Sequence, residues 1–208
     1  MSDPSIVCET HEDRVILQNA RLRLVFHRLG DRWTHHLAIP AAGSSFTELV
    51  SVVESDPARD DRSRVVSPVY QELHYHETSE EGQNGHCLLV TGLLHDHHFS
   101  AAVTFRSDAS GAATVEFDVA DRCRSPVHSF ASTYLLRLGS SSLVDANTEL
   151  ITWSVPEVLD PNRLEITCAP PTSLALAEAG RSATRARAVA TIDPSVYTHR
   201  LRYCWRTS

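Results

Sequence analysis

Lysine is missing from this chain of 208 residues, in which all 19 basic residues are arginine. A Schiff-base lysine and a Walker-A phosphate loop both require lysine, so the sequence excludes both mechanisms. The 26 acidic residues give a formal net charge of −7, and there is no run of basic residues. A chain of this charge is expected not to bind nucleic acid.

Long apolar runs are absent as well. No segment approaches the roughly 18 apolar residues of a membrane span, so we expect no membrane association. The first residues, MSDPSIVCETHEDR, lack a basic start and an apolar core, so we expect no signal peptide. The five cysteines are scattered and form no Cys-x-x-Cys pair, which is typical of inert thiols in a reducing compartment. The sequence therefore predicts a cytoplasmic protein.

Several local catalytic motifs are also missing. There is no Gly-x-Ser-x-Gly elbow, Gly-x-Gly-x-x-Gly turn, His-Glu-x-x-His helix or EF-hand loop. A carboxylate pair for glycoside hydrolysis cannot be chosen either, because the fold sets its partners and sequence spacing does not. No single motif therefore identifies the chemistry.

Alternation of apolar and polar residues dominates what is present. It is clearest in segments 20–27, 99–106, 113–121 and 199–206. In the third of these, Val115, Phe117 and Val119 share one face. A period of two is typical of half-buried antiparallel strands. With turn signals at strand spacing, the pattern predicts an all-β fold: a large antiparallel β-sandwich that spans residues 1–208 as a single domain.

Three segments need a separate interpretation. Ser45 and Glu48 stand at capping-box spacing, which makes 45–53 a helix candidate. The alanine-rich segment 185–192 is interpreted as a strand. Segment 86–94 is apolar on both faces, which predicts a central strand of its sheet.

The twelve histidines are the most unusual feature. If residues 69–77 form a strand, Tyr70, Glu72, His74 and His76 share one face, since side chains alternate. A carboxylate beside two imidazoles can perform acid–base catalysis, so Glu72, His74 and His76 are the candidate catalytic residues. The alternative is an ordinary solvated sheet face.

The same histidines are candidate metal ligands. Residues i and i+2 of a strand stand about 7 Å apart, so His74 and His76 can converge on one ion. A catalytic zinc site needs a third protein ligand. If 70–77 and 86–94 form a hairpin, His86 falls near His76 and can supply that ligand. The predicted metal site is therefore His74, His76 and His86, with a divalent metal such as zinc as the cofactor.

The segment LLHDHHFS, residues 93–100, contains three further histidines. Asp96 favours a turn. His95 and His97 have the parity of Phe99 and would point toward the core if the extended conformation persists. The segment is either part of a metal site or a polar β-turn.

Residues 32–39 are expected to form a strand with Trp33 and His35 on one face and His36 on the other. Trp33 is either a platform for a sugar ring or a core residue. His35 is expected to be a hydrogen-bonded core histidine, and His36 is freer. Trp33, His36 and Tyr70 are therefore the candidate substrate-binding residues.

The opening VILQNARLRLVFHRLGDRWTHHLAIP resembles the first hairpin of the galactose-mutarotase-like β-sandwich superfamily. The resemblance covers about residues 14–40, through an N-x-x-L-x-L-x-F strand and a glycine turn. It implies a carbohydrate-binding protein, and the catalytic members use histidines with a glutamate for acid–base work at the anomeric centre. This chain is shorter than typical members, and their Asn-Gly-Pro-Asn and His-Pro-Tyr-Phe-Asn-Leu motifs are missing.

A second segment, HYHETSE, is similar to the His-x-His-x-x-x-Glu motif of cupins through His74, His76 and Glu80. The glycine that precedes this motif in cupins is missing, and the second cupin motif is not recognisable. The sequence thus favours carbohydrate binding or acid–base chemistry on a sugar. A cupin-like metalloprotein and a non-catalytic interaction domain remain open alternatives.

Overall fold

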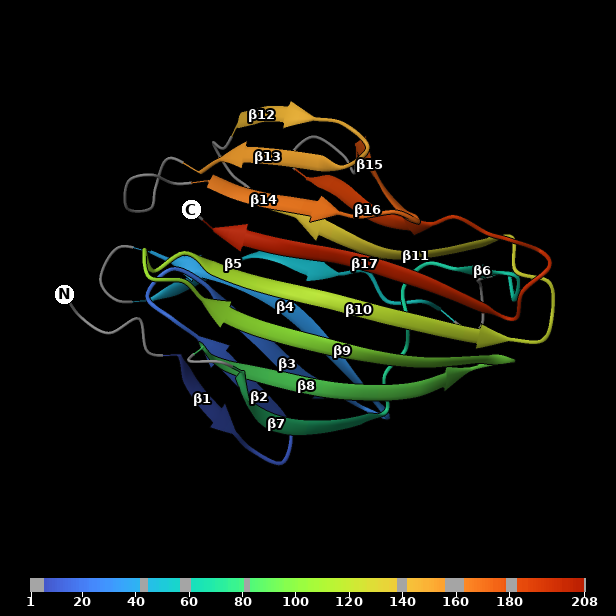
Figure 1. Ribbon diagram of the computed structural model, residues 1–208, viewed down its shortest axis with the longest axis horizontal. Coiled ribbons are helices and arrows are strands. Elements are labelled where there is room, and N and C mark those ends of the chain that lie inside the picture. Colours follow the sequence, from blue (N-terminus) through green and yellow to red (C-terminus); the bar gives the residue numbers. More distant parts are fainter. Residues whose placement is uncertain are drawn as a thin grey trace.

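The computed structural model describes residues 6–41, 45–56, 61–80, 83–137, 142–155, 163–178 and 183–207. Within these ranges every regular element is a β-strand, and the strands form two sheets that pack as one sandwich (Figure 1). The predicted all-β sandwich is therefore confirmed. No helix in this part of the chain is long and apolar enough to cross a membrane.

The sheet at the back of Figure 1 has nine strands. Eight of them pair antiparallel in the order β1-β2-β3-β4-β5-β11-β16-β15, and β6 pairs parallel with β11. The bounds are β1 (Val7–Thr10), β2 (Arg14–Gln18), β3 (Arg23–Leu29), β4 (Arg32–Pro40), β5 (Phe46–Val52), β6 (Arg64–Val65), β11 (Ser129–Leu136), β15 (Thr172–Glu178) and β16 (Thr184–Ala190). Because β1 to β5 follow one another along the chain, half of this sheet forms from sequential pairings.

The sheet at the front has eight antiparallel strands in the order β12-β13-β14-β17-β10-β9-β8-β7. The bounds are β7 (Glu72–Glu80), β8 (Gln83–Leu94), β9 (His97–Ser107), β10 (Ala113–Cys123), β12 (Ser142–Ala146), β13 (Leu150–Ser154), β14 (Arg163–Cys168) and β17 (Thr198–Thr207). The longest strands, β8, β9, β10 and β17, lie side by side and form its body (Figure 1).

The helix expected at 45–53 is wrong, since β5 occupies most of that range. β5 pairs with β4 on one side and with β11 on the other. Hydrogen bonding to two neighbouring strands outweighs a local capping pattern, because tertiary context routinely overrides propensity. The strand interpretation of 185–192 is confirmed by β16.

The central position expected for 86–94 is also wrong. β8 is the second strand from the edge of its sheet, between β7 and β9. Its outer face is open to solvent, as the exposed fractions of Leu89 (42%) and Leu93 (51%) show. The apolar residues on that face therefore do not indicate a second buried layer.

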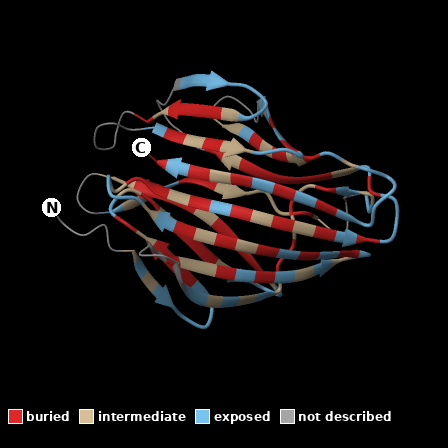
Figure 2. Cartoon of the chain, in the orientation of Figure 1, coloured by how far each residue is buried: buried red, intermediate tan, exposed pale blue. Residues whose placement is uncertain are grey.

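The core lies between the two sheets, where buried residues alternate with exposed ones along each strand (Figure 2). Aromatic rings connect the layers. The hydroxyl of Tyr134 on β11 lies 2.7 Å from the hydroxyl of Tyr203 on β17. His35 on β4 is 3.0 Å from the Tyr134 hydroxyl and stacks on Phe26. Burial lowers the pKa of His35 to about 3, so this histidine is a neutral core residue, as expected.

Candidate functional site

Glu72, His74 and His76 share the exposed outer face of β7, as the alternation predicts. β7 is the edge strand of the eight-stranded sheet. The Glu72 carboxylate accepts a hydrogen bond of 3.1 Å from the Thr91 hydroxyl on β8. The three side chains therefore stand in a row on an open edge. Their catalytic role stays a prediction.

The three predicted metal ligands do not converge. In the β7–β8 hairpin, His76 lies opposite Cys87 and Glu77 lies opposite His86. A difference of one residue reverses the face, so His86 points away from the side that carries His74 and His76. His86 instead lies 2.7 Å from the Tyr75 hydroxyl. Within the described residues, no three His, Cys, Asp or Glu side chains are grouped so that they could hold a metal ion.

Two of the predicted substrate-binding residues lie in the core. Trp33 and Tyr70 are 7% and 2% exposed. Tyr70 precedes β7, and its carbonyl oxygen accepts a hydrogen bond of 2.7 Å from the Trp33 backbone amide. Neither ring can serve as a platform for a sugar at the protein surface.

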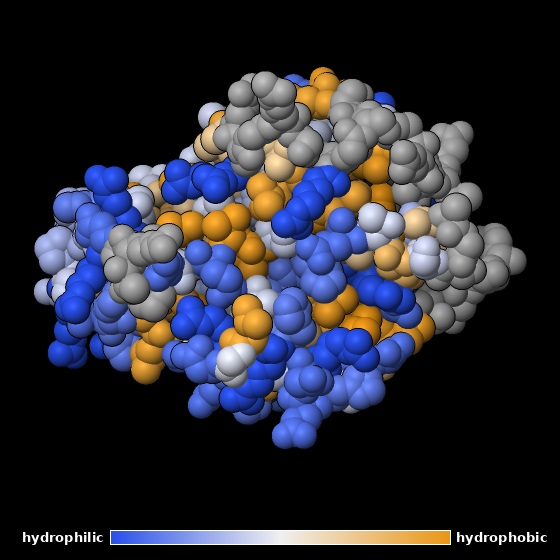
Figure 3. Space-filling model, turned by 180° about the vertical axis from the view of Figure 1, so that it is seen from behind, coloured by the Kyte–Doolittle hydropathy of each residue, from blue (hydrophilic) through white to orange (hydrophobic). Residues whose placement is uncertain are grey.

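The third predicted substrate-binding residue, His36, lies in a groove on the outer face of the nine-stranded sheet. We call this the β2–β5 groove, and it encloses about 440 Å³. It is lined by Arg14, Ile16, Arg23, Val25, His27, His36, Ala38, Phe46 and Glu48. From behind, the molecule shows orange apolar surface between blue polar side chains (Figure 3). A concave site of this volume with an apolar floor and a few polar groups is typical of small-molecule binding.

Strand register explains how this groove is assembled. Val25 on β3 lies opposite both Ile16 on β2 and His36 on β4, so the three share one face. Side chains alternate along each strand, so residues two positions away join the same face. A register shift between β4 and β5 places Glu48 opposite Ala38.

The polar groups of the groove are held by their neighbours. His36 Nδ1 lies 3.9 Å from a carboxylate oxygen of Glu48, and the His27 and His36 ring centroids are 5.6 Å apart. Arg137 donates a hydrogen bond of 3.2 Å to the other Glu48 oxygen. Arg23 lies over the Phe46 ring at 3.9 Å from its centroid.

The charge state of His36 follows from this environment. Partial burial lowers its pKa below the ordinary value, Glu48 opposes that shift, and the neighbouring His27 and Arg23 add to it. His36 is therefore a neutral imidazole at pH 7 and can accept a proton. A neutral imidazole in such a groove can act as a general base.

Sequence reasoning missed most of the groove. His27 could have been found, because its parity in 23–29 puts it on the face opposite Leu24 and Phe26. Glu48 could not, because its segment was assigned to a helix. The helix prediction for 45–53 therefore kept the carboxylate beside His36 out of the predicted site.

The segment LLHDHHFS divides among three environments. β8 ends at Leu94, His95 and Asp96 form the turn, and β9 begins at His97. The predicted turn and the predicted core orientation of His97 are confirmed, whereas His95 is exposed.

His97 forms a buried pair. Its Nδ1–H donates to the Asp121 carboxylate at 2.7 Å, and its Nε2–H donates to the Arg62 carbonyl at 2.8 Å. A carbonyl oxygen can only accept, so both ring nitrogens carry hydrogen when Asp121 is ionised. Burial opposes the charged imidazole, but the bonds to Asp121 and Arg62 raise the pKa of His97 above its ordinary value.

A comparison with protein-family models and a comparison with curated proteins both find no match to this chain. What can be said of its function therefore rests on the geometry described above.

Proposed function

We propose that this protein binds a carbohydrate in the β2–β5 groove, and that it is a galactose-mutarotase-like protein. The observation that carries the proposal is the meeting of the His36–Glu48 pair, His27 and the Phe46 ring in one groove of about 440 Å³. The superfamily resemblance implies histidines with a glutamate, and this groove supplies that set of side chains.

The lining suits a sugar ring, which presents C–H groups on its faces and hydroxyl groups at its edge. Ile16, Val25 and Ala38 form an apolar floor, and Phe46 adds an aromatic ring. The guanidinium of Arg23 and the carboxylate of Glu48 stand on the same lining and can bind hydroxyl groups. The cavity at the His95–Asp96 turn is larger, at about 580 Å³, but no Phe, Tyr or Trp is among the described residues that line it.

The same groups support acid–base chemistry at an anomeric carbon. In mutarotation a base removes the proton of the anomeric hydroxyl, an acid protonates the ring oxygen, and the bond between that oxygen and the anomeric carbon breaks. The open-chain aldehyde then rotates, and ring closure reverses both proton transfers: the acid regains the proton of the ring oxygen, and the base returns its proton to the new anomeric hydroxyl. Neutral His36 can take the first proton, Glu48 orients it, and His27 is close enough to deliver the second.

The test begins with a screen of mono- and oligosaccharides, followed by calorimetric titration of the best binder. We expect Phe46→Ala and Glu48→Gln each to weaken binding about tenfold or more, because each removes a direct contact. Glu72→Gln on β7 is the matched control, since it makes the same chemical change on the face predicted from sequence. It should leave the affinity unchanged.

Two results would reject the proposal. One is the absence of any saccharide that binds. The other is binding that is lost in Glu72→Gln and retained in Glu48→Gln, which would assign the site to the β7 face. Polarimetry of anomer interconversion separates a catalyst from a binding protein.

A further inference from the structure

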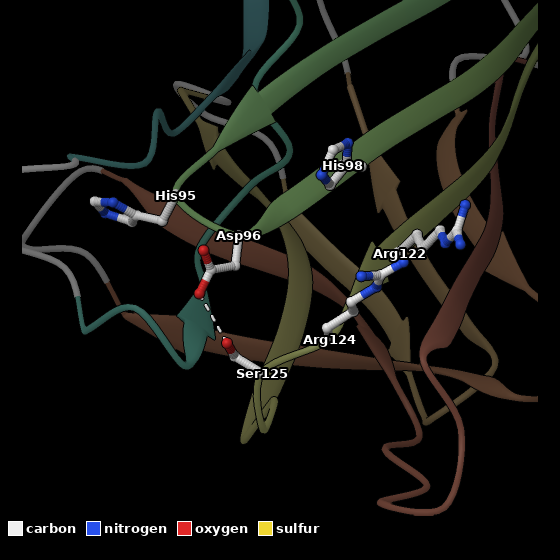
Figure 4. Close-up of a pocket in the computed structure, with 6 residues that line it drawn as sticks. All are labelled: His95, Asp96, His98, Arg122, Arg124 and Ser125. Atoms are coloured by element: carbon white, nitrogen blue, oxygen red, sulfur yellow. Dashed lines mark hydrogen bonds between the residues drawn. The ribbon is translucent and has the colours of Figure 1, made fainter.

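A second cavity lies where the β8–β9 turn meets the end of β10, on the eight-stranded sheet. It encloses about 580 Å³. Its lining consists of His95, Asp96, His98, Arg122, Arg124 and Ser125 (Figure 4). The β2–β5 groove is on the outer face of the other sheet, so the two sites are separate.

Cationic side chains gather on one side of this cavity. Arg122 on β10 lies directly opposite His98 on β9, and both are exposed. Arg124 follows two residues later and lines the same cavity as Arg122 and His98 (Figure 4). His95 points away from the arginines, and it has the left-handed backbone angle φ of 55°. Three groups that can donate to an anion thus face one space.

Asp96, the acidic residue among the described lining residues, bonds to a hydroxyl group and to neither arginine. The Asp96 carboxylate accepts a hydrogen bond of 2.7 Å from the Ser125 hydroxyl, as the dashed line in Figure 4 shows. Neither Arg122 nor Arg124 forms an ion pair with an acidic side chain within the described residues. By contrast, Arg200 and Arg202 share the carboxylate of Asp118.

This arrangement is electrostatically unusual for a chain with a net charge of −7. Guanidinium groups stay charged at every relevant pH, so two arginines that line one cavity make its potential positive and favour an anion there. Arginine donates through a planar fork that fits a phosphate or sulfate in two-point contact. A bound oxyanion would offset this positive charge and occupy the donors.

We propose that this cavity binds a small tetrahedral oxyanion, a phosphate or sulfate group, through Arg122, Arg124 and His98. The site is independent of the carbohydrate proposal, because it shares no residue with the β2–β5 groove. The anion is either the free ion or the terminal group of a phosphorylated small molecule.

Calorimetric titration of the full chain tests this site with three probes at constant ionic strength in chloride: inorganic phosphate, inorganic sulfate and phenyl phosphate. We expect saturable one-to-one binding of at least one probe. Arg122→Gln/Arg124→Gln should weaken it about tenfold or more, because charge-assisted bonds are lost. The matched control is Arg185→Gln/Arg187→Gln on β16, which removes two charges at the same spacing and should change the affinity less than about twofold.

Two additions make the result decisive. Tighter binding of phenyl phosphate than of phosphate supports a phosphorylated small molecule, and equal binding supports the free ion. The NMR chemical shifts of the imidazole groups locate the site. The His98 resonance should shift on saturation with the anion, whereas the resonances of His27 and His36 in the other groove should not. If the double variant does not fold, Arg124→Gln alone serves, because Arg124 lies beyond the end of β10.

Three outcomes would overturn the proposal. They are no saturable binding of any probe, equal weakening in the Arg122→Gln/Arg124→Gln variant and its β16 control, and imidazole shifts confined to His27 and His36.

Discussion

At the scale of single residues, two buried histidines differ in charge because their partners differ. His35 meets a phenol hydroxyl and aromatic rings, and these do not offset the cost of taking a positive charge out of water. His97 meets a carboxylate and a carbonyl oxygen, which can. The pKa of His35 is therefore lowered and that of His97 is raised.

The lowered pKa of His35 predicts a loss of stability in acid. In the unfolded chain this imidazole gains a proton near its ordinary pKa of about 6.5, whereas in the folded chain it does so only near pH 3. The folded state thus binds fewer protons between these values, and its stability falls as the pH falls. From about pH 6.5 to about pH 4 this group should cost about 3 kcal/mol. Urea unfolding of the native chain and His35→Gln across that range measures it, and parallel pH curves would contradict the prediction.

A comparison of Asp121 and Asp118 variants tests how strongly burial affects the contribution of an ion pair to stability. Both are on β10, but the Asp121 side chain is 0% exposed and that of Asp118 is 24% exposed. Asp121→Ala leaves His97 buried without its counter-charge, and we expect a loss of about 3–5 kcal/mol. Asp118→Ala removes an exposed pair with Arg200 and Arg202 and should cost about 0–1 kcal/mol. Denaturant unfolding at pH 7 compares the two, and similar losses would show that burial does not govern the pair.

At the scale of elements, the crossing of residues 69–71 over β8 depends on one glycine. A Cβ atom at Gly92 would lie 2.1 Å from the Val69 carbonyl oxygen, which is far inside contact distance. The absence of a side chain lets this segment approach, and the backbone N–H of Gln71 donates a hydrogen bond of 2.7 Å to the Thr91 carbonyl. This approach brings Tyr70 into the core.

Gly92→Ala should therefore destabilise the fold by about 2–4 kcal/mol, because the backbone of one segment must move. Gly30→Ala is the control, since nothing lies within 4 Å of its added methyl group. Its φ of +64° adds a backbone penalty of about 1–2 kcal/mol. Thermal unfolding ranks the two variants, and a smaller loss for Gly92→Ala would contradict the close approach.

Strands could be predicted where apolar and polar residues alternate clearly. They could not be predicted where the pairing between strands decides the structure. The strand that contains Val115, Phe117 and Val119 followed from alternation and is β10. The position of Tyr70 did not, because the face it shares with Glu72 depends on a strand that continues without a break, and β7 begins only at Glu72. The residue that lies opposite His86 depends on the length of the hairpin loop between β7 and β8. A shift of one residue in this register moves the His86 side chain to the other face of the sheet.

At the scale of the whole molecule, the sandwich leaves two outer faces, and each carries a cavity. The sequence predicted the sandwich because burial between two sheets follows from alternation alone. It could not predict which distant side chains share a groove, because that depends on strand order. His36 and Glu48 meet only because β4 and β5 are neighbours.

The central claim is that the β2–β5 groove holds the carbohydrate. A crystal structure of the chain with the tightest-binding saccharide tests it most directly. The account predicts a sugar ring beside Phe46, with hydroxyl groups within hydrogen-bond distance of His36 and Glu48. A sugar bound instead over Glu72, His74 and His76 on β7, with the groove empty, would contradict it.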